Sequence, residues 1–171
     1  MNDELKVYLD TSAVSYLDQQ DSPEKMIITQ NAWKELCSGK YEVVVSDVLF
    51  NELSKCENEK FERLISYVNE LPLVVFEEET DENVLLALKL IEHNIVKDSS
   101  FEDALHIATA LRSNCDILLS WDMKHIVNIK TVNKVKQFCF LYKFKVILDI
   151  YTPEYLINGE EEEWKNILVY P

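Results

Sequence analysis

The chain contains 171 residues, of which 47% are apolar and only two are glycine. This length fits one domain with a sizeable core, and the composition excludes disordered, collagen-like and glycine-rich architectures. The net charge of −14 argues against general, charge-driven binding of nucleic acid. We expect no membrane span and no signal peptide, and the four scattered cysteines suit a reducing cytoplasm.

The charge is distributed unevenly along the chain. Residues 123–148 contain six lysines and no aspartate or glutamate, so the other residues together carry −20 against a net charge of −14 for the whole chain. Two interpretations of this basic stretch are open. Either the lysines form a solvated face, or they provide a local track for phosphate groups on an otherwise repulsive protein.

Short apolar segments alternate with amphipathic segments along the chain. The apolar segments predict buried strands at residues 5–10, 42–46, 73–76, 115–122 and 145–148. The amphipathic segments predict helices at residues 13–17, 23–37, 48–53, 61–71, 83–93, about 99–113 and 131–144, with a last short turn from residue 152. Strands and helices that alternate without a repeat or a linker predict an α/β domain with a largely parallel sheet.

Residues 103–111 are the segment around which the other elements are arranged. This helix is apolar on nearly every side, which is typical of a helix buried between other layers, yet it carries Asp103 and His106. Ser99 and Glu102 predict a capping box at its start. Because an uncompensated buried carboxylate is costly, Asp103 needs a positive partner. That partner is either the helix N-terminus or a metal ion shared with other carboxylates.

Three other acids are expected to join Asp103. Asp10 and Asp122 follow predicted strands, and Glu52 lies early in a predicted helix. The carboxyl ends of parallel strands share one edge of the sheet with the starts of the following helices, so we expect the four carboxylates to converge. Two simpler interpretations stay open: Asp10 only caps the next helix, and Glu52 is an exposed helix charge.

A cluster of four acids is tolerable chiefly around a divalent cation, because like charges raise one another's pKa. Oxygen ligands favour Mg²⁺ or Mn²⁺, which polarise a phosphodiester and lower the pKa of a bound water. The pattern therefore predicts hydrolysis of phosphodiester bonds without a covalent intermediate. A phosphatase with Asp10 as nucleophile fits less well, because Ser12 stands where a second aspartate is usual.

The ordered set of motifs resembles the PIN-domain signature, and more narrowly it is similar to the VapC-like toxin nucleases. The resemblance extends from residue 5 to about residue 156 and rests on Asp10-Thr11-Ser12, Glu52, Asp103-Ala104-Leu105-His106-Ile107-Ala108 and Ser120-Trp121-Asp122. It implies a three-layer α/β/α sandwich around a parallel sheet with strand order 3-2-1-4-5. It also implies a PIN-like nuclease domain at residues 1–157, followed by an acidic C-terminal tail at residues 158–171.

The same resemblance implies a function. The chain would be an endoribonuclease that depends on Mg²⁺ or Mn²⁺, and the toxin of a toxin–antitoxin pair. It would form a homodimer, cut RNA and be blocked by an antitoxin protein. The catalytic and metal-binding residues would be Asp10, Glu52, Asp103 and Asp122, supported by the hydroxyl groups of Thr11 and Ser120.

Residues outside the acidic set receive smaller roles. Lys124 and Lys130 follow Asp122 and predict contacts with RNA phosphates. His106 is expected to be a packed helix residue and His125 to lie near the rim, so both stay outside the catalytic set. The acidity of the chain favours a short, structured or partner-delivered RNA. The alternative function is a PIN-fold module that binds RNA or protein and cuts weakly or not at all.

Overall fold

A five-stranded parallel sheet forms the centre of the molecule, for which the computed structural model describes residues 4–97 and 100–158. The strands are β1 (Leu5–Leu9), β2 (Tyr41–Ser46), β3 (Val74–Glu77), β4 (Ile117–Leu119) and β5 (Asp149–Tyr151). Every pairing is parallel and the strand order is β3-β2-β1-β4-β5. Both the fold class and the predicted strand order are therefore confirmed.

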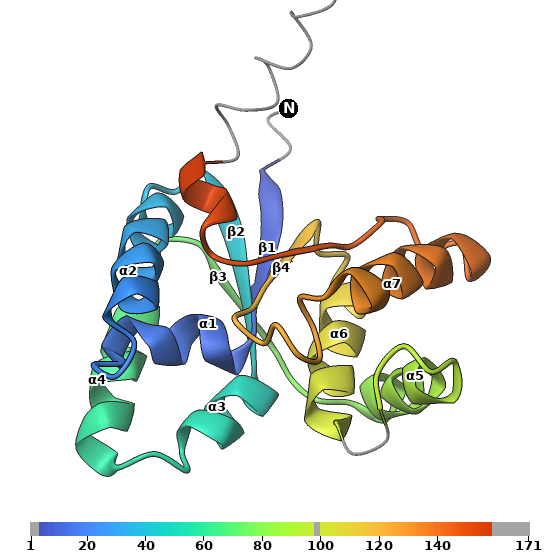
Figure 1. The fold of residues 1–171 in the computed structure, drawn as a ribbon, viewed down its shortest axis with the longest axis horizontal. Helices are drawn as coiled ribbons and strands as arrows, with labels where there is room; N and C mark the ends of the chain where they lie inside the picture. The colour runs from blue at the N-terminus through green and yellow to red at the C-terminus, as the bar shows by residue number, and fades with distance from the viewer. Residues whose placement is uncertain (1–3, 98–99, 159–171) are drawn as a thin grey trace, which may run out of the picture.

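Helices cover both faces of the sheet. They are α1 (Thr11–Ser15), which continues into a 3₁₀ turn η1 (Tyr16–Asp18), α2 (Pro23–Cys37), α3 (Asp47–Leu53), α4 (Asn58–Asn69), α5 (Asp81–Glu92), α6 (Phe101–Arg112) and α7 (Ile129–Leu141). Figure 1 shows α1 to α4 on one side of the sheet and α5 to α7 on the other. The three-layer sandwich follows from this arrangement.

Alternate residues of the inner strands supply two separate cores. Tyr8, Val44 and Leu118 belong to the core that packs under α5, α6 and α7. Their neighbours Val7 and Val43 belong to the core under the other helices. Successive strand side chains point to opposite faces, so a sheet covered on both sides needs apolar residues on both faces. The inner strands are accordingly apolar in their central residues, whereas near their starts Lys6 of β1 lies opposite Glu42 of β2 and forms an ion pair with it.

Helix α6 is buried as the sequence predicts. Every residue from Ala104 to Leu111 is buried, including His106. The predicted cap Ser99 lies outside the described residues. The structure places Ser100 at the N-cap position, without a hydrogen bond from its side chain to the helix backbone.

The prediction for the fifth strand is wrong in position. β5 begins at Asp149 and pairs Ile150 with Leu118 of β4, whereas residues 145–148 precede it and are not a strand. Ile147 and Leu148 pack against the core beneath α5 to α7 instead. Asp149 is accommodated at the start of β5 by an ion pair with Lys136, 2.6 Å long. The apolar run therefore packs against the helix layer, and a run that begins with an acid forms the edge strand.

Other boundaries differ by a few residues. β4 covers only Ile117–Leu119 of the predicted 115–122, and α7 ends at Leu141, shortly before Lys143 adopts a left-handed backbone conformation with φ of 55°. The predicted tail at 158–171 lies outside the described residues apart from Asn158, so the domain division stays a prediction. Within residues 4–97 and 100–158, no helix has the length and apolar character needed to cross a membrane.

Candidate metal centre

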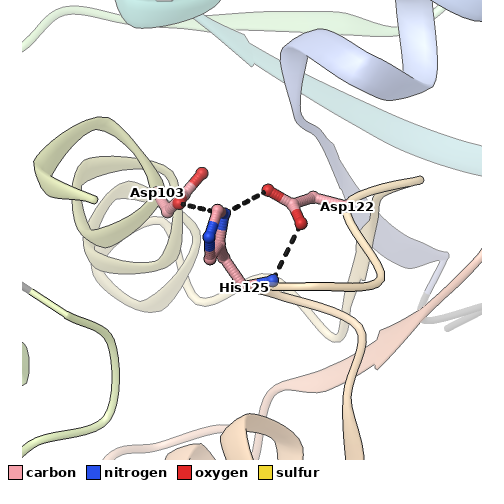
Figure 2. A group of neighbouring side chains, drawn as sticks. All are labelled: Asp103, Asp122 and His125. Atoms are coloured by element: carbon pink, nitrogen blue, oxygen red, sulfur yellow. Dashed lines mark hydrogen bonds and ion pairs between the residues drawn. The ribbon is translucent and has the colours of Figure 1, made fainter. Parts of the chain in front are cut away.

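Two of the four predicted acids lie close to each other, together with a histidine. Asp103 comes from the first turn of α6, whereas Asp122 and His125 come from the loop that follows β4. His125 Nδ1 lies 3.0 Å from Asp122 Oδ2 and 3.4 Å from Asp103 Oδ2, so the imidazole stands between the two carboxylates (Figure 2). One ligand atom from each residue lies within 4.8 Å of the others. This acid–histidine cluster has the composition and spacing of a metal site.

The loop after β4 orients Asp122 through local bonds. The backbone N–H groups of Lys124 and His125 donate to Asp122 Oδ1 at 2.9 and 2.8 Å. The backbone N–H of Asp122 donates to Ser120 Oγ at 2.9 Å. Side-chain oxygens of aspartate commonly stabilise turns in this way. Asp122 Oδ1 is therefore used by the turn itself, which leaves Oδ2 directed at His125.

The electrostatics of the cluster favour a cation. Burial raises the pKa of Asp103 most, and the nearby charge of Asp122 raises it further. His125 and His106 oppose these effects, and the pKa reaches about 6 instead of 3.8. A divalent cation would relieve the desolvation and repulsion, so the residues fit such an ion. The imidazole also widens the choice beyond the all-oxygen set that the sequence predicts.

Asp10 lies at the C-terminal end of β1 and is buried. Its Oδ1 accepts from the backbone N–H of Ala13 at 2.8 Å and from the Ser12 hydroxyl at 2.7 Å, so Asp10 does cap α1. Its Oδ2 accepts from the Ser120 hydroxyl at 2.5 Å. Burial raises the pKa of Asp10, although His106 and these hydrogen bonds oppose the rise. Capping and a place at the site are thus compatible roles for this residue.

The capping role of Asp10 leads to a stability prediction. Asp10→Ala leaves the Ala13 N–H of α1 without its acceptor, whereas Asp10→Asn removes the charge and keeps an acceptor oxygen. We expect Asp10→Ala to be less stable than Asp10→Asn by about 1–2 kcal/mol. Urea denaturation followed by circular dichroism measures the difference. Equal stability of the two variants would show that the cap contributes nothing.

Glu52 projects from α3 into a chain of hydrogen bonds that is part-buried at Glu52 and buried at Tyr8. Its Oε2 accepts from the Thr11 hydroxyl and lies 2.8 Å from His106 Nε2. His106 Nδ1 lies 2.8 Å from the Tyr8 hydroxyl, which in turn lies 2.7 Å from Ser46 Oγ. A carboxylate only accepts, so Nε2 carries a proton, and the Tyr8 hydroxyl can donate to Nδ1 while accepting from Ser46.

The hydrogen bonds to Glu52 have a larger effect on its pKa than its burial has. Burial raises the pKa of Glu52, but hydrogen bonds from His106 and Thr11 lower it more, so the net pKa falls below the usual 4.5. The side chain is about a quarter exposed, at 27%. Glu52 is therefore a partly buried, ionised group rather than the exposed helix charge of the simpler interpretation.

The four acids are linked, but not all by direct contact. Asp10 connects to Asp122 through Ser120, whose hydroxyl donates to the first and accepts from the backbone of the second. Glu52 connects to α6 through His106. Among the described residues, the group with metal-ligand spacing contains Asp103 and Asp122 but neither Asp10 nor Glu52.

Sequence reasoning missed the roles of both histidines of this site. His106 is packed, as expected, at 3% exposure, yet both of its ring nitrogens have polar partners. His125 is 29% exposed, which agrees with a place near the rim, but it also lies between two carboxylates, and this contact was not predicted. A signal was present, because each histidine follows an acid by three residues: His106 follows Asp103, and His125 follows Asp122. That spacing puts both side chains of a pair on one face of a helix or turn.

The lysines of residues 123–148 do not form one continuous track. Lys124 and Lys130 are exposed and line a cavity that also includes His125. Lys136, by contrast, is paired with Asp149. The two predicted RNA-binding lysines therefore lie next to the acid–histidine cluster, and at least one other lysine serves the fold.

Comparisons with known proteins agree with this architecture. The family model described as the PIN domain matches residues 7–127. VapC20 of Mycobacterium tuberculosis, a toxin that cleaves the sarcin–ricin loop, is 17% identical, with a TM-score of 0.54 over 69% of this chain and 91% of that one. A chain of VapBC2 from Rickettsia felis, solved bound to promoter DNA, is 14% identical, with a TM-score of 0.50 over 85% of this chain and 98% of that one. No curated protein matches the sequence. The family model covers most of the chain and the structures share its fold, so the chain belongs to the PIN domain family.

Proposed function

We propose that the chain is a Mg²⁺- or Mn²⁺-dependent endoribonuclease and the toxin of a toxin–antitoxin pair. The observation that carries this proposal is the cluster of Asp103, Asp122 and His125, where two carboxylates repel each other at the carboxyl edge of the parallel sheet. Family membership supports it, as does the likeness to VapC20, a toxin that cleaves the sarcin–ricin loop.

Each residue of the site has a role in this proposal. Asp103 and Asp122 would hold the cation directly, with His125 as a further ligand or as the group that orients them. When bound, the cation supplies polarisation of the phosphodiester and activation of a water nucleophile. Asp10 and Glu52 complete the negative surface around it. Their orientation is fixed by hydroxyl donors, Ser120 for Asp10 and Thr11 for Glu52.

Lys124 and Lys130 are proposed to contact RNA phosphates beside the cluster. We expect Lys124→Gln/Lys130→Gln to weaken RNA binding and to make its salt dependence shallower, by about 0.7 logarithmic units for each phosphate that is no longer neutralised. Fluorescence anisotropy with a labelled single-stranded RNA at several salt concentrations measures both effects. If the slope is the same as that of the wild type, these lysines do not contact phosphates.

The partner proposals rest on exposed apolar side chains. Leu85 and Leu88 on α5 are 65% and 49% exposed, and Ile129, Phe140 and Leu141 on α7 are 76%, 70% and 64% exposed. Exposed apolar side chains of this kind are available to a homodimer interface and to an antitoxin. All four cysteines are free, which suits the proposed location in the cytoplasm.

The experiment that tests the function is cleavage of a panel of labelled single-stranded RNAs with Mn²⁺, Mg²⁺ or EDTA. The wild type, Asp10→Asn and the surface control Glu59→Gln are compared, because Glu59 is an exposed acid on α4. We expect cutting that needs metal, survives in Glu59→Gln and disappears in Asp10→Asn. A folded wild type that binds RNA without cutting it in any metal would favour a non-catalytic PIN-fold module instead.

A further inference from the structure

A cavity of about 340 Å³ opens beside the acid–histidine cluster. Its walls come from the end of α5 and the residues after it, from the loop that follows β4 and from the first turns of α7. Volumes of this size lie within the range of roughly 300–1,000 Å³ that is usual for small-ligand sites. The cavity can hold a group about as large as a nucleotide.

The charge of this cavity is opposite to that of the protein as a whole. Four lysines line it, and none of the described residues that line it is an aspartate or glutamate. The lysines are Lys97, Lys124, Lys130 and Lys134, all of them exposed. In a chain with a net charge of −14, four cations at one cavity form a local site for an anionic group.

The cavity has an apolar wall and a fixed frame. Ile91, Ile95 and Val96 line one side of it, and the last two are buried. Lys134 Nζ donates to the backbone carbonyl of Asn94 at 2.5 Å, which ties α7 to the end of α5. An apolar surface beside ammonium groups can accept the ribose or base of a nucleotide together with its phosphate.

The cavity adjoins the candidate metal centre at His125. His125 lines the cavity, and the same ring lies 3.0 Å from Asp122 and 3.4 Å from Asp103. An RNA strand with one phosphodiester at the acid–histidine cluster would therefore have the cavity next to it, on the other side of His125.

We propose that this cavity is a substrate subsite that receives the RNA nucleotide adjacent to the scissile phosphodiester, with its phosphate held by Lys97 and Lys134. The proposal rests on the proposed nuclease function and names a binding site for that activity. It explains how an acidic protein engages RNA: the contact is confined to one cavity instead of spread over the surface. It also favours short or looped single strands, since a nucleotide must leave its stack to enter.

The test compares two pairs of lysines from the same protein. Lys97→Gln/Lys134→Gln removes two charges from the cavity. Lys143→Gln/Lys145→Gln removes two exposed charges that do not line it. Affinity for a fluorescein-labelled single-stranded RNA is measured by anisotropy in the Asp10→Asn background. Cleavage by the same lysine variants is measured with Asp10 intact.

We expect the cavity pair to raise Kd and KM about tenfold, to leave kcat within about twofold and to make the salt dependence shallower, while the control pair changes none of these. Equal losses in both pairs would overturn the subsite, because the lysines would then act only through general charge. An unchanged KM in the cavity pair would also overturn it while leaving the nuclease intact. If the cavity pair lost binding to a poly-glutamate peptide but kept its RNA affinity, the cavity would be a site for an acidic protein segment. This result would also overturn the subsite.

The two proposals fail separately in this design. A wild type that cuts RNA, with an unchanged KM in the cavity pair, retains the nuclease function and loses the subsite. A wild type that does not cut, although its RNA affinity depends on Lys97 and Lys134, loses the nuclease function and supports the cavity as an RNA site.

Discussion

Asp103→Asn is expected to reduce RNA cleavage at least a thousandfold and, at the same time, to stabilise the metal-free protein at neutral pH. Cleavage falls because the variant lacks one of the two carboxylates with metal-ligand spacing. Stability rises because the ionised Asp103 is partly buried, at 21% exposure, and is repelled by Asp122. A substitution that destroys activity and strengthens the fold is the expected behaviour of a functional site whose charges are unfavourable without a ligand.

The pH dependence of this effect has a definite sign. The folded protein binds the Asp103 proton more tightly than the unfolded chain does, because the pKa rises from 3.8 to about 6. The contribution of Asp103 to stability therefore decreases as pH rises from about 4 to about 6, and the full penalty is present above that window. We expect a gain of about 1–3 kcal/mol for Asp103→Asn at pH 7.5, and a smaller gain at pH 4.

Urea denaturation at both pH values, in EDTA, measures this gain. Glu102→Gln is the matched control, because Glu102 is the exposed neighbour of Asp103 in the same helical turn. The control should change neither cleavage nor stability by much. A loss of stability in Asp103→Asn at pH 7.5 would contradict the electrostatic description of the cluster, and full activity in this variant would contradict its proposed role.

His106→Ala is expected to lower the free energy of unfolding by about 2–4 kcal/mol, the range for emptying a packed site and breaking buried hydrogen bonds. The side chain is 3% exposed and joins the Tyr8 hydroxyl to Glu52. Without it, Glu52 keeps only the Thr11 hydroxyl as a partner in this chain of hydrogen bonds. We therefore expect cleavage to fall at least tenfold as well, because Glu52 is no longer held in a fixed position.

The pH dependence separates the Glu52 contact from simple packing. Hydrogen bonding by His106 and Thr11 lowers the pKa of Glu52, so this contribution to stability is present above the ordinary value of 4.5 and is lost as pH falls through the lowered pKa. The difference in free energy of unfolding between the wild type and His106→Ala should therefore narrow as the pH falls below 4.5.

Tyr8→Phe provides the graded comparison for His106→Ala. It removes the hydroxyl that joins His106 to Ser46 and keeps the pair of His106 and Glu52. We expect a loss of about 1 kcal/mol and little change in cleavage. If Tyr8→Phe impaired cleavage as strongly as His106→Ala does, the orientation of Glu52 would depend on the whole chain of hydrogen bonds rather than on His106 alone.

The fold could be predicted from the sequence because its signals are local and repeated. The alternation of apolar strands with amphipathic helices predicted a parallel sheet, and the apolar pattern of α6 on nearly every side predicted a buried helix. The position of β5 could not be predicted in the same way. Its register is the pairing with β4, which joins residues about thirty positions apart in the sequence.

The site was predictable to the extent that topology determines it. Asp10 and Asp122 follow strands that end at one edge of the sheet, so their convergence follows from the chain order. The position of His106 depends on the direction of its side chain, and that of His125 depends on the turn after β4. A shift of the helix or of the turn by one residue would direct either ring away from its carboxylate partner. The basic cavity was harder still, since Lys97 and Lys134 come from segments far apart in the sequence.

Direct titration of the purified chain with Mn²⁺ bears most directly on the candidate metal centre. Isothermal titration calorimetry at pH 7.5 would compare the wild type with Asp103→Asn, Asp122→Asn and the control Glu102→Gln. We predict saturable Mn²⁺ binding in the wild type and in the control, and its absence or strong weakening in both site variants. Absence of Mn²⁺ binding by the folded wild type, or equal binding by all four proteins, would contradict a metal centre at Asp103 and Asp122.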